Sequence, residues 1–88
     1  MMYKVTLTKK AEKNKKSLPP VVSKKFVLLL MELKMLGPMR TNWKNYSKLG
    51  INKHHCHINY NWVACWEETK TGVKIEVYYV GSRESSPY

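Results

Sequence analysis

The sequence predicts a small α+β domain in which two N-terminal helices pack on a mainly antiparallel β-sheet, in the order β-α-α-β-β-β. Apolar side chains repeat at helical spacing over residues 21–36. The segments 3–8, 53–66 and 73–80 instead alternate apolar and polar side chains, as half-buried strands do. A chain of 88 residues has room for only one hydrophobic core, so we expect residues 1–88 to form a single domain.

The chain begins with a predicted strand and a short basic helix. Residues Tyr3 to Thr8 alternate and are rich in β-forming side chains, which is typical of a half-buried strand. Residues 9–16 are mostly lysine, with Ala11 as almost the only apolar side chain, and this predicts a short solvated helix. Its lysines either form a solvated surface or contact phosphate groups of a ligand.

A longer helix follows the break at residues 17–20, because Pro19 and Pro20 lack a backbone donor and suit the opening positions of a helix. Its inward stripe should consist of Val22, Phe26, Leu29, Leu30 and Leu33. We expect Met31 and Met35 to fill gaps in the same core. Gly37 and the proline after it predict the end of this helix.

Residues 39–50 are polar and predicted to be irregular, with cations and aromatic rings in turn: Arg40, Trp43, Lys44, Tyr46 and Lys48. Such a mixture suits single-stranded nucleic acid, because phosphates bind cations and bases stack on flat rings. Alternatively, Trp43 and Tyr46 fold back onto the core, where large aromatic side chains are usually at least partly buried.

The overall charge indicates a polyanionic partner. Sixteen Lys and Arg residues against six Asp and Glu residues give a net charge of +10. The alternative to a polyanionic partner is that the lysines only keep a small protein soluble. The longest apolar run, residues 26–31, is too short to cross a bilayer, so we expect no membrane association. The opening residues 1–4 lack the apolar segment of a signal peptide, which predicts a cytoplasmic protein with free thiols.

Residues 53–66 hold all three histidines and two of the three tryptophans of the chain. A two-residue turn at Tyr60 and Asn61, followed by strict pairing, sets Cys56 opposite Cys65. Strand alternation then turns Cys56, Ile58, Val63 and Cys65 toward the helices. The open face is predicted to carry His55, His57, Trp62 and Trp66. Imidazoles that titrate near neutral pH beside stacking indoles indicate RNA as the ligand.

Two other uses of this hairpin are weaker. Histidine and cysteine can hold zinc, but strand alternation points Cys56 away from His55 and His57, so we expect no metal site. A disulfide between Cys56 and Cys65 is disfavoured in the cytoplasm.

The C-terminal part of the chain combines a strand with a short tail. Val73, Ile75, Val77 and Tyr79 are predicted to face the core from one side of the last strand. The chain then leaves the sheet at Gly81 and closes with a tail that contains Arg83 and Tyr88. We expect the end of the strand to bring these two side chains beside His55 and His57.

In the order of its elements and in several motifs, the chain resembles the RelE/ParE toxin superfamily of bacterial and archaeal toxin–antitoxin systems, and its RelE branch in particular. The similar segments are Tyr3-Lys4-Val5-Thr6-Leu7-Thr8-Lys9-Lys10-Ala11, Leu18-Pro19, His55-Cys56-His57 with Tyr60-Asn61-Trp62, and Val80-Gly81-Ser82-Arg83-Glu84 through Tyr88. The resemblance covers nearly the whole chain, and it lies in the order and spacing of these motifs.

The resemblance implies a ribosome-dependent endoribonuclease that cuts messenger RNA and so inhibits translation. In RelE-type chemistry the 2′-hydroxyl of the RNA attacks the adjacent phosphate without a metal ion, so no cofactor is expected. The implied partners are the ribosome, messenger RNA and a cognate antitoxin that is acidic and helical.

The resemblance also implies roles for single residues. His57 matches the position of the general base and His55 that of a neighbouring cation or proton carrier. Arg83 matches a residue that binds the phosphate or acts on the leaving group, and Tyr88 an aromatic side chain that positions the cut nucleotide. Candidates for RNA binding are Lys44, Lys48, Lys53, Trp62 and Trp66.

One departure affects these roles, because some RelE members have an arginine where this chain has Asn61 and Trp62. Phosphate stabilisation would then rest more heavily on Arg83 and the lysines. The alternative functions are a gyrase poison of the ParE type and a basic RNA-binding module without catalysis. The His-x-His motif together with the Arg and Tyr of the tail favours the nuclease.

Overall fold

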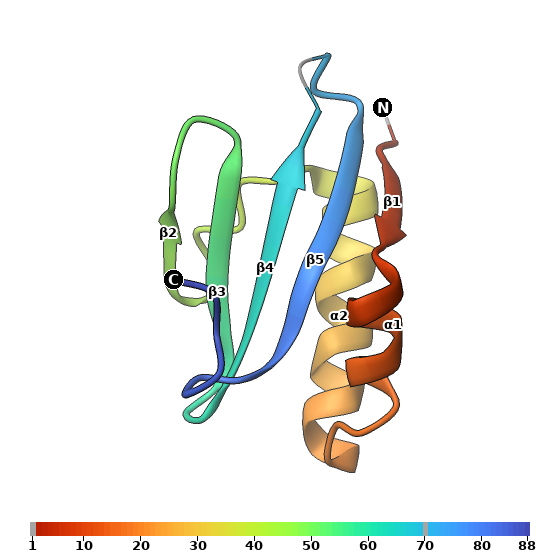
Figure 1. The fold of residues 1–88 in the computed structure, drawn as a ribbon. Coiled ribbons are helices and arrows are strands. Elements are labelled where there is room, and N and C mark those ends of the chain that lie inside the picture. The colour runs from red at the N-terminus through yellow and green to blue at the C-terminus, as the bar shows by residue number, and fades with distance from the viewer. Residues whose placement is uncertain (1, 70) are drawn as a thin grey trace.

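The computed structural model describes residues 2–69 and 71–88 and contains two helices beside a five-stranded sheet (Figure 1). Its elements are β1 (Lys4–Leu7), α1 (Lys9–Lys15), α2 (Pro20–Leu36), β2 (Lys44–Lys48), β3 (Lys53–Asn59), β4 (Trp62–Glu68) and β5 (Lys74–Ser82). The predicted α+β class is confirmed. The segment predicted to be irregular adds β2 as a further strand at the edge of the sheet.

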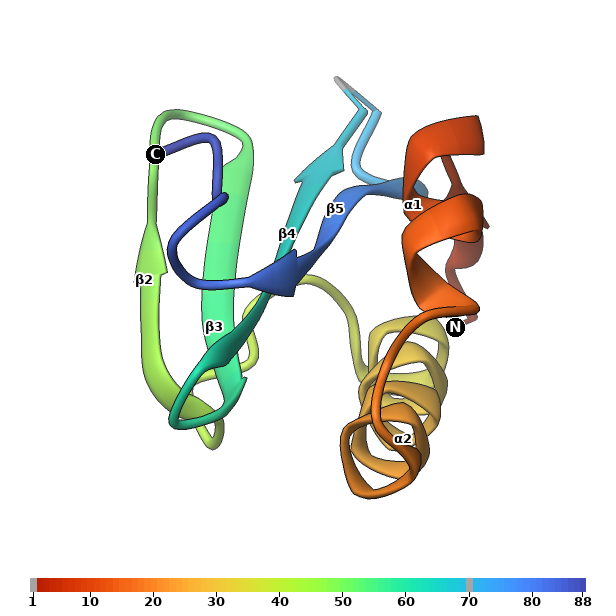
Figure 2. The ribbon, with the colours of Figure 1, turned by 60° about the horizontal axis from the view of Figure 1, so that its bottom comes forward.

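The strands lie in the order β1-β5-β4-β3-β2. β1 pairs with β5 in parallel, and the other neighbours are antiparallel. The end of β5 lies beside the turn between β3 and β4, since Ser82 pairs with Trp62. From there the C-terminal tail crosses over β4 and β3 toward β2 (Figure 2).

Local sequence signals set the ends of the helices. The Thr8 hydroxyl accepts a hydrogen bond of 3.1 Å from the Ala11 N–H and caps α1. α2 begins at Pro20, where the missing N–H costs nothing. It ends at Leu36 and is followed by Gly37, whose φ of 95° suits glycine. Within the described residues, neither helix is long and apolar enough to cross a bilayer.

α2 buries only one of its sides. Val22, Phe26, Leu29 and Leu33 form the core with residues of the sheet, as the spacing predicted. Met31 and Met35 do not fill gaps in that core, because the sheet covers a single side of α2 and these side chains are on the other. They are 55% and 61% exposed. Val27 and Leu28 lie exposed along the same helix.

The sheet has one face covered by helices and one open face. Cys56, Ile58, Ala64, Trp66, Ile75 and Val77 pack with the helices, whereas Val63, Cys65 and Tyr79 form a smaller apolar cluster on the open face. Register shifts in both hairpins cause this sorting. Cys65 pairs with Tyr79 but Trp66 pairs with Val77, so an extra residue in β5 turns Tyr79 to the open face. The prediction that Tyr79 faces the core together with Val77 was therefore wrong.

Candidate functional site

The hairpin of β3 and β4 determines which histidines share a surface. Its turn lies at Tyr60 and Asn61, as predicted. The pairing then skips Ile58, so His57 lies opposite Val63 and Cys56 lies opposite Ala64. A strict register would have set Val63 opposite Ile58, Ala64 opposite His57 and Cys65 opposite Cys56. A one-residue shift moves side chains to the opposite face. His55 and His57 therefore share the open face with Val63 and Cys65, not with tryptophans.

Both tryptophans predicted to stack on RNA belong to the helix-covered face. Trp66 is 0% exposed, and its indole N–H donates a hydrogen bond of 3.0 Å to the Pro38 carbonyl. A buried ring offers no surface to a base, so the predicted RNA-binding role of Trp66 was wrong. Trp62 is half-buried and packs against the core cluster of the helices. The prediction that it lies on the open face beside the histidines was wrong as well.

On the open face, the tail folds back onto the two histidines. The ring centroid of Tyr88 lies 4.3 Å from that of His55, and the rings of His55 and His57 lie 6.1 Å apart. Ser47 of β2 fixes the first imidazole, with its hydroxyl 3.1 Å from Nδ1 of His55. The extra strand β2 thus orients a histidine that the sequence singled out.

Arg83 is held near the same surface by the backbone of the tail. Its N–H donates a hydrogen bond of 2.8 Å to the Asn61 carbonyl, which ties the tail to the turn of the hairpin. Its guanidinium carbon lies 5.5 Å from the ring centroid of Tyr60, at cation–π distance. We name the group of His55, His57, Arg83 and Tyr88 the histidine site.

The environment keeps both imidazoles of the histidine site in the neutral form. Burial lowers the pKa of His55, and the neighbouring His57 lowers it further. Burial also lowers the pKa of His57, with added repulsion from Arg83 and Lys44. A neutral imidazole can accept a proton at physiological pH. Burial raises the pKa of the Tyr88 phenol, which therefore stays protonated.

A hollow of about 360 Å³ opens beside His57. Lys25 of α2 and Lys44 of β2 contribute cations, and Trp43 and Tyr60 contribute aromatic surface. Lys44 also lies directly opposite His57 in the sheet. The combination of cations and rings at one end of the histidine site suits a strand of nucleic acid.

The other two candidate lysines lie apart from each other. Lys53 is two residues before His55 on β3 and shares its face, with its ammonium 5.9 Å from the Tyr78 ring centroid. Lys48 pairs with His54 and lines a separate hollow with Tyr3 and His54. Lys48 is thus on the side of the helices, away from the histidine site, and its contact with RNA stays a prediction.

His54 and its aromatic neighbours have a structural environment. His54 is 1% exposed, with Nε2 2.8 Å from a Glu68 oxygen and Nδ1 2.6 Å from the Tyr46 hydroxyl. Its ring stacks on Trp66 at 5.9 Å. Trp43 donates a hydrogen bond of 2.9 Å to Glu32 and packs against the core. Trp43 and Tyr46 both fold back onto the core, which was the second of the two alternatives for these side chains.

The cysteines are free and buried on opposite faces of the sheet. Because Cys56 lies opposite Ala64 and Cys65 lies opposite His55, the cross-strand pairing of the thiols was a wrong prediction. Burial raises the pKa of each thiol to about 12, so neither is a thiolate at neutral pH. Across residues 2–69 and 71–88, no three histidine, cysteine or carboxylate groups converge as metal ligands do.

Three residues of the site's surroundings were not singled out by the sequence analysis, namely Lys25, Ser47 and Tyr60. Ser47 contacts His55 only because residues 44–48 form a strand, and their polar pattern gave no sign of one. Tyr60 could have been found from the sequence, because it is a large aromatic residue at the tip of a predicted turn, where burial is not expected.

No protein-family model matches the chain, and no curated protein matches it. Solved structures do match. A chain of the archaeal RelE–RelB complex from Pyrococcus horikoshii OT3 is 15% identical, with 98% of this chain and 100% of that chain covered and a TM-score of 0.76. The YoeB dimer from Staphylococcus aureus is 15% identical, with 94% and 99% covered and a TM-score of 0.75. The isolated E. coli RelE toxin is 18% identical, with 97% and 88% covered and a TM-score of 0.73.

These identities are too low to carry an activity from one chain to another, but the agreement in shape extends over nearly the full length of both chains. The two helices and the five-stranded, mostly antiparallel sheet together match the fold of these toxins. The sequence predicted this arrangement from its resemblance, and the comparison of structures confirms it. The chain has the fold of the RelE and YoeB toxins.

Proposed function

We propose that this protein is the toxin of a type II toxin–antitoxin system and a ribosome-dependent endoribonuclease that cleaves messenger RNA. One observation carries the proposal: Tyr88 at the end of the tail packs 4.3 Å from His55, so groups from β3 and from the tail come together at one surface, where His55 is 8% exposed. That surface combines two neutral imidazoles, a guanidinium and a phenol. These are the groups that metal-independent cleavage of RNA needs.

In the proposed reaction, His57 removes the proton from a 2′-hydroxyl of the RNA. The 2′-oxygen then forms a bond to the adjacent phosphorus while the bond from phosphorus to the 5′-oxygen breaks. The products are a 2′,3′-cyclic phosphate and a 5′-hydroxyl: the leaving oxygen takes up one proton from solvent water, and His57 returns its own proton to the solvent. A lowered pKa suits His57 to this role, because its imidazole is ready to accept a proton at neutral pH.

The other groups of the histidine site act on charge and position. Arg83 places a permanent positive charge near His57, where it stabilises the negative charge that develops on the phosphate. Tyr88 keeps its proton and presents a ring that is half exposed, so it can stack on a base or donate a hydrogen bond to a phosphate oxygen. His55 holds Tyr88 and carries or relays protons beside His57.

The hollow beside His57 is the proposed path of the RNA strand. Lys25 and Lys44 bind phosphates there, and the exposed ring of Tyr60 offers a stacking surface under Arg83. Lys53 extends the positive surface at the other end of β3. Since binding depends on lysine and arginine, affinity for RNA or ribosomes should fall steeply as the salt concentration rises.

The proposed protein partner is an acidic, helical antitoxin, and the exposed side of α2 suits it. Leu28, Met31 and Met35 form an apolar stripe, and Lys24 and Lys25 lie beside it. A helix with an apolar side and acidic edges would cover this surface. Among the similar structures, RelE is in complex with RelB and YoeB with YefM. Met31→Glu should weaken binding of the antitoxin without changing cleavage, which titration of the inhibitor against cleavage activity would measure.

The decisive test is a reconstituted translation system with purified ribosomes and a defined messenger RNA. The wild-type protein should cut within translated codons and leave the two product ends named above, which end mapping and phosphatase treatment identify. A double variant with His55→Ala and His57→Ala serves as the inactive control. EDTA added after assembly of stabilised ribosomes should not stop the cut, since no step is assigned to a metal ion.

Two results would contradict the proposal. Transcripts that remain intact, together with induced DNA damage in cells that express the protein, would indicate a gyrase poison. Loss of the cut in EDTA with recovery on addition of zinc would indicate that the histidines bind metal.

A further inference from the structure

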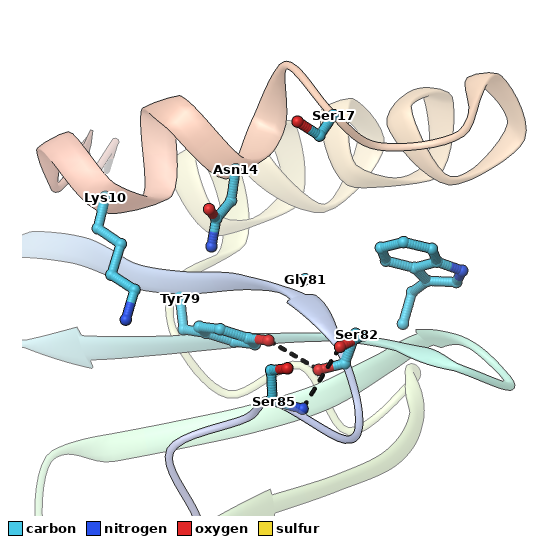
Figure 3. Close-up of a pocket in the computed structure, with 8 residues that line it drawn as sticks. Lys10, Asn14, Ser17, Tyr79, Gly81, Ser82 and Ser85 are labelled. Atoms are coloured by element: carbon cyan, nitrogen blue, oxygen red, sulfur yellow. Dashed lines mark hydrogen bonds between the residues drawn. The ribbon is translucent and has the colours of Figure 1, made fainter.

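A second hollow lies between α1 and the end of β5, beside the first turn of the tail (Figure 3). Its volume is about 400 Å³, within the range of small-ligand pockets, roughly 300 to 1,000 Å³. Its walls include Lys10, Asn14, Ser17, Trp62, Ser82 and Ser85. We call it the tail pocket. The proposed cleavage uses none of these residues.

The chemistry of the tail pocket suits a nucleotide. Lys10 and Asn14 are four residues apart on α1, and both side chains extend toward the strand and the tail (Figure 3). An ammonium group binds phosphate, and an amide offers a donor and an acceptor to the edge of a base. Trp62 adds an indole surface for stacking. None of the described wall residues carries a carboxylate that would repel an anion.

Hydrogen bonds within the chain set the shape of the tail pocket. The Tyr79 hydroxyl donates a hydrogen bond of 2.7 Å to the Ser82 carbonyl and so fixes the end of β5 at the pocket. Gly81 permits this contact, because a Cβ there would lie 2.8 Å from the Tyr79 phenol oxygen. The Ser85 N–H donates a hydrogen bond of 3.4 Å to the Ser82 hydroxyl. A ligand would therefore enter a surface whose shape is already fixed, which limits the entropy lost on binding.

The tail pocket also lies within reach of an RNA strand at the histidine site. His57, Val63 and Gly81 occupy one row across β3, β4 and β5. Neighbouring strands are about 4.8 Å apart, so the backbones of His57 and Gly81 are roughly 10 Å apart. About three stacked nucleotides, each rising about 3.4 Å, span that distance.

We infer that the tail pocket binds one nucleotide of the same RNA strand, a few positions from the cut linkage, with its phosphate at Lys10 and its base against Trp62. Asn14 would read the edge of that base and so contribute to the sequence preference of the cut. The inference rests on the proposed function and deepens it by making α1 part of the RNA-binding surface.

Binding of nucleoside 5′-monophosphates to the isolated, isotope-labelled protein tests the tail pocket without any cleavage. NMR should show shifts of the Asn14 side-chain amide, the Trp62 indole N–H and the Ser85 amide. Lys10→Ala and Asn14→Ala should each weaken this binding by about tenfold, the usual effect of one lost charged or bidentate contact. Lys16→Ala removes the same charge from the same segment outside the pocket and should change affinity less than about twofold.

The outcomes separate this inference from the proposed function. Shifts at His55 and Tyr88 without shifts at Asn14 and Trp62 would overturn the tail pocket and leave the cleavage site in place. Shifts at the tail pocket with intact messenger RNA on ribosomes would overturn the nuclease and leave the nucleotide pocket. If messenger RNA is cut and Asn14→Ala leaves the bases around the mapped ends unchanged, Asn14 does not read the sequence.

Discussion

The two faces of the central sheet use the same residue types for opposite purposes. On the face of the helices, His54 is 1% exposed, and both of its ring nitrogens have partners in Tyr46 and Glu68. On the open face, His55 is 8% exposed and His57 is half-buried, and the Tyr88 ring of the tail packs at a tilt against His55. His54 and His55 are neighbours in the chain. The comparison shows that the face of the strand, and not the residue type, decides whether a histidine stabilises the fold or is available for chemistry.

The aromatic side chains divide in the same way. Trp66 contacts His54 inside the core, whereas Tyr88 contacts His55 on the surface. Truncating Trp66 in the core should therefore reduce stability, and truncating His57 on the open face should reduce activity at nearly unchanged stability.

The largest effect on activity should come from His57→Ala. Loss of a general base lowers the rate about 10²- to 10⁴-fold. Because His57 is half-buried on the open face, the free energy of unfolding should stay within about 1 kcal/mol of the wild type. Single-turnover cleavage on ribosomes and urea denaturation measure the two quantities. A variant that still cleaves would show that His57 is not the general base. A variant that unfolds would show that His57 stabilises the fold, as His54 does.

Trp66→Ala tests the covered face. Truncation of a large buried aromatic residue costs about 3–5 kcal/mol of stability. Trp62→Ala is the matched control, because Trp62 is on the same strand but only half-buried, and it should cost clearly less in the same urea titration. Equal costs for the two variants would contradict the assignment of Trp66 to the core and Trp62 to its edge.

His54→Leu should have an intermediate effect on stability. Leucine leaves the Tyr46 hydroxyl and the Glu68 carboxylate without their partner, and an unsatisfied buried polar group costs about 1–3 kcal/mol. His57→Leu makes the same chemical change on the open face and should leave stability almost unaltered. Thermal unfolding of both variants checks the difference, and a larger loss for His57→Leu would reverse the comparison.

Most of the fold follows from local sequence signals. Lysine-rich residues 9–16, the proline pair before α2 and the alternation of the hairpin all predict elements that the structure contains. β2 could not be predicted, because its residues are polar and take part in the sheet only through pairing with β3. Edge strands of this kind depend on tertiary contacts and not on hydrophobic pattern.

The sequence singles out the residues of the candidate site, but it does not show on which face of the sheet each of them lies. Ile58 has no partner in β4, and this bulge places Trp62 and Trp66 on the face of the helices. No residue type near Ile58 predicts a bulge there. His55 and His57 stay together because they are two residues apart on one strand, whatever their register. Arg83 and Tyr88 lie beside these histidines because the Arg83 N–H binds the Asn61 carbonyl and the tail folds back onto His55. These are tertiary contacts, and the sequence pattern does not predict them.

A smaller effect concerns the charge around the open face. Burial, Arg83 and Lys44 all lower the pKa of His57, so removing the Lys44 charge should raise it. Lys44→Gln should therefore move the NMR titration of His57 to higher pH, and the acid limb of the cleavage profile should follow, since the base acts only when neutral. Lys9→Gln, which removes an equal charge from the start of α1, is the control. A His57 titration that is the same in both variants would separate Lys44 from the histidine site.

The same pKa shift has a consequence for stability with a definite sign. The folded-state pKa of His57 lies below the unfolded value of about 6.5. The unfolded chain therefore binds more protons between these two values, and stability that is present above pH 6.5 is lost as pH falls through the folded pKa. Lys44→Gln narrows that interval and should make the free energy of unfolding less sensitive to acid, as urea titrations at a series of pH values would show. An unchanged dependence would mean that Lys44 acts on RNA alone and not on the imidazole.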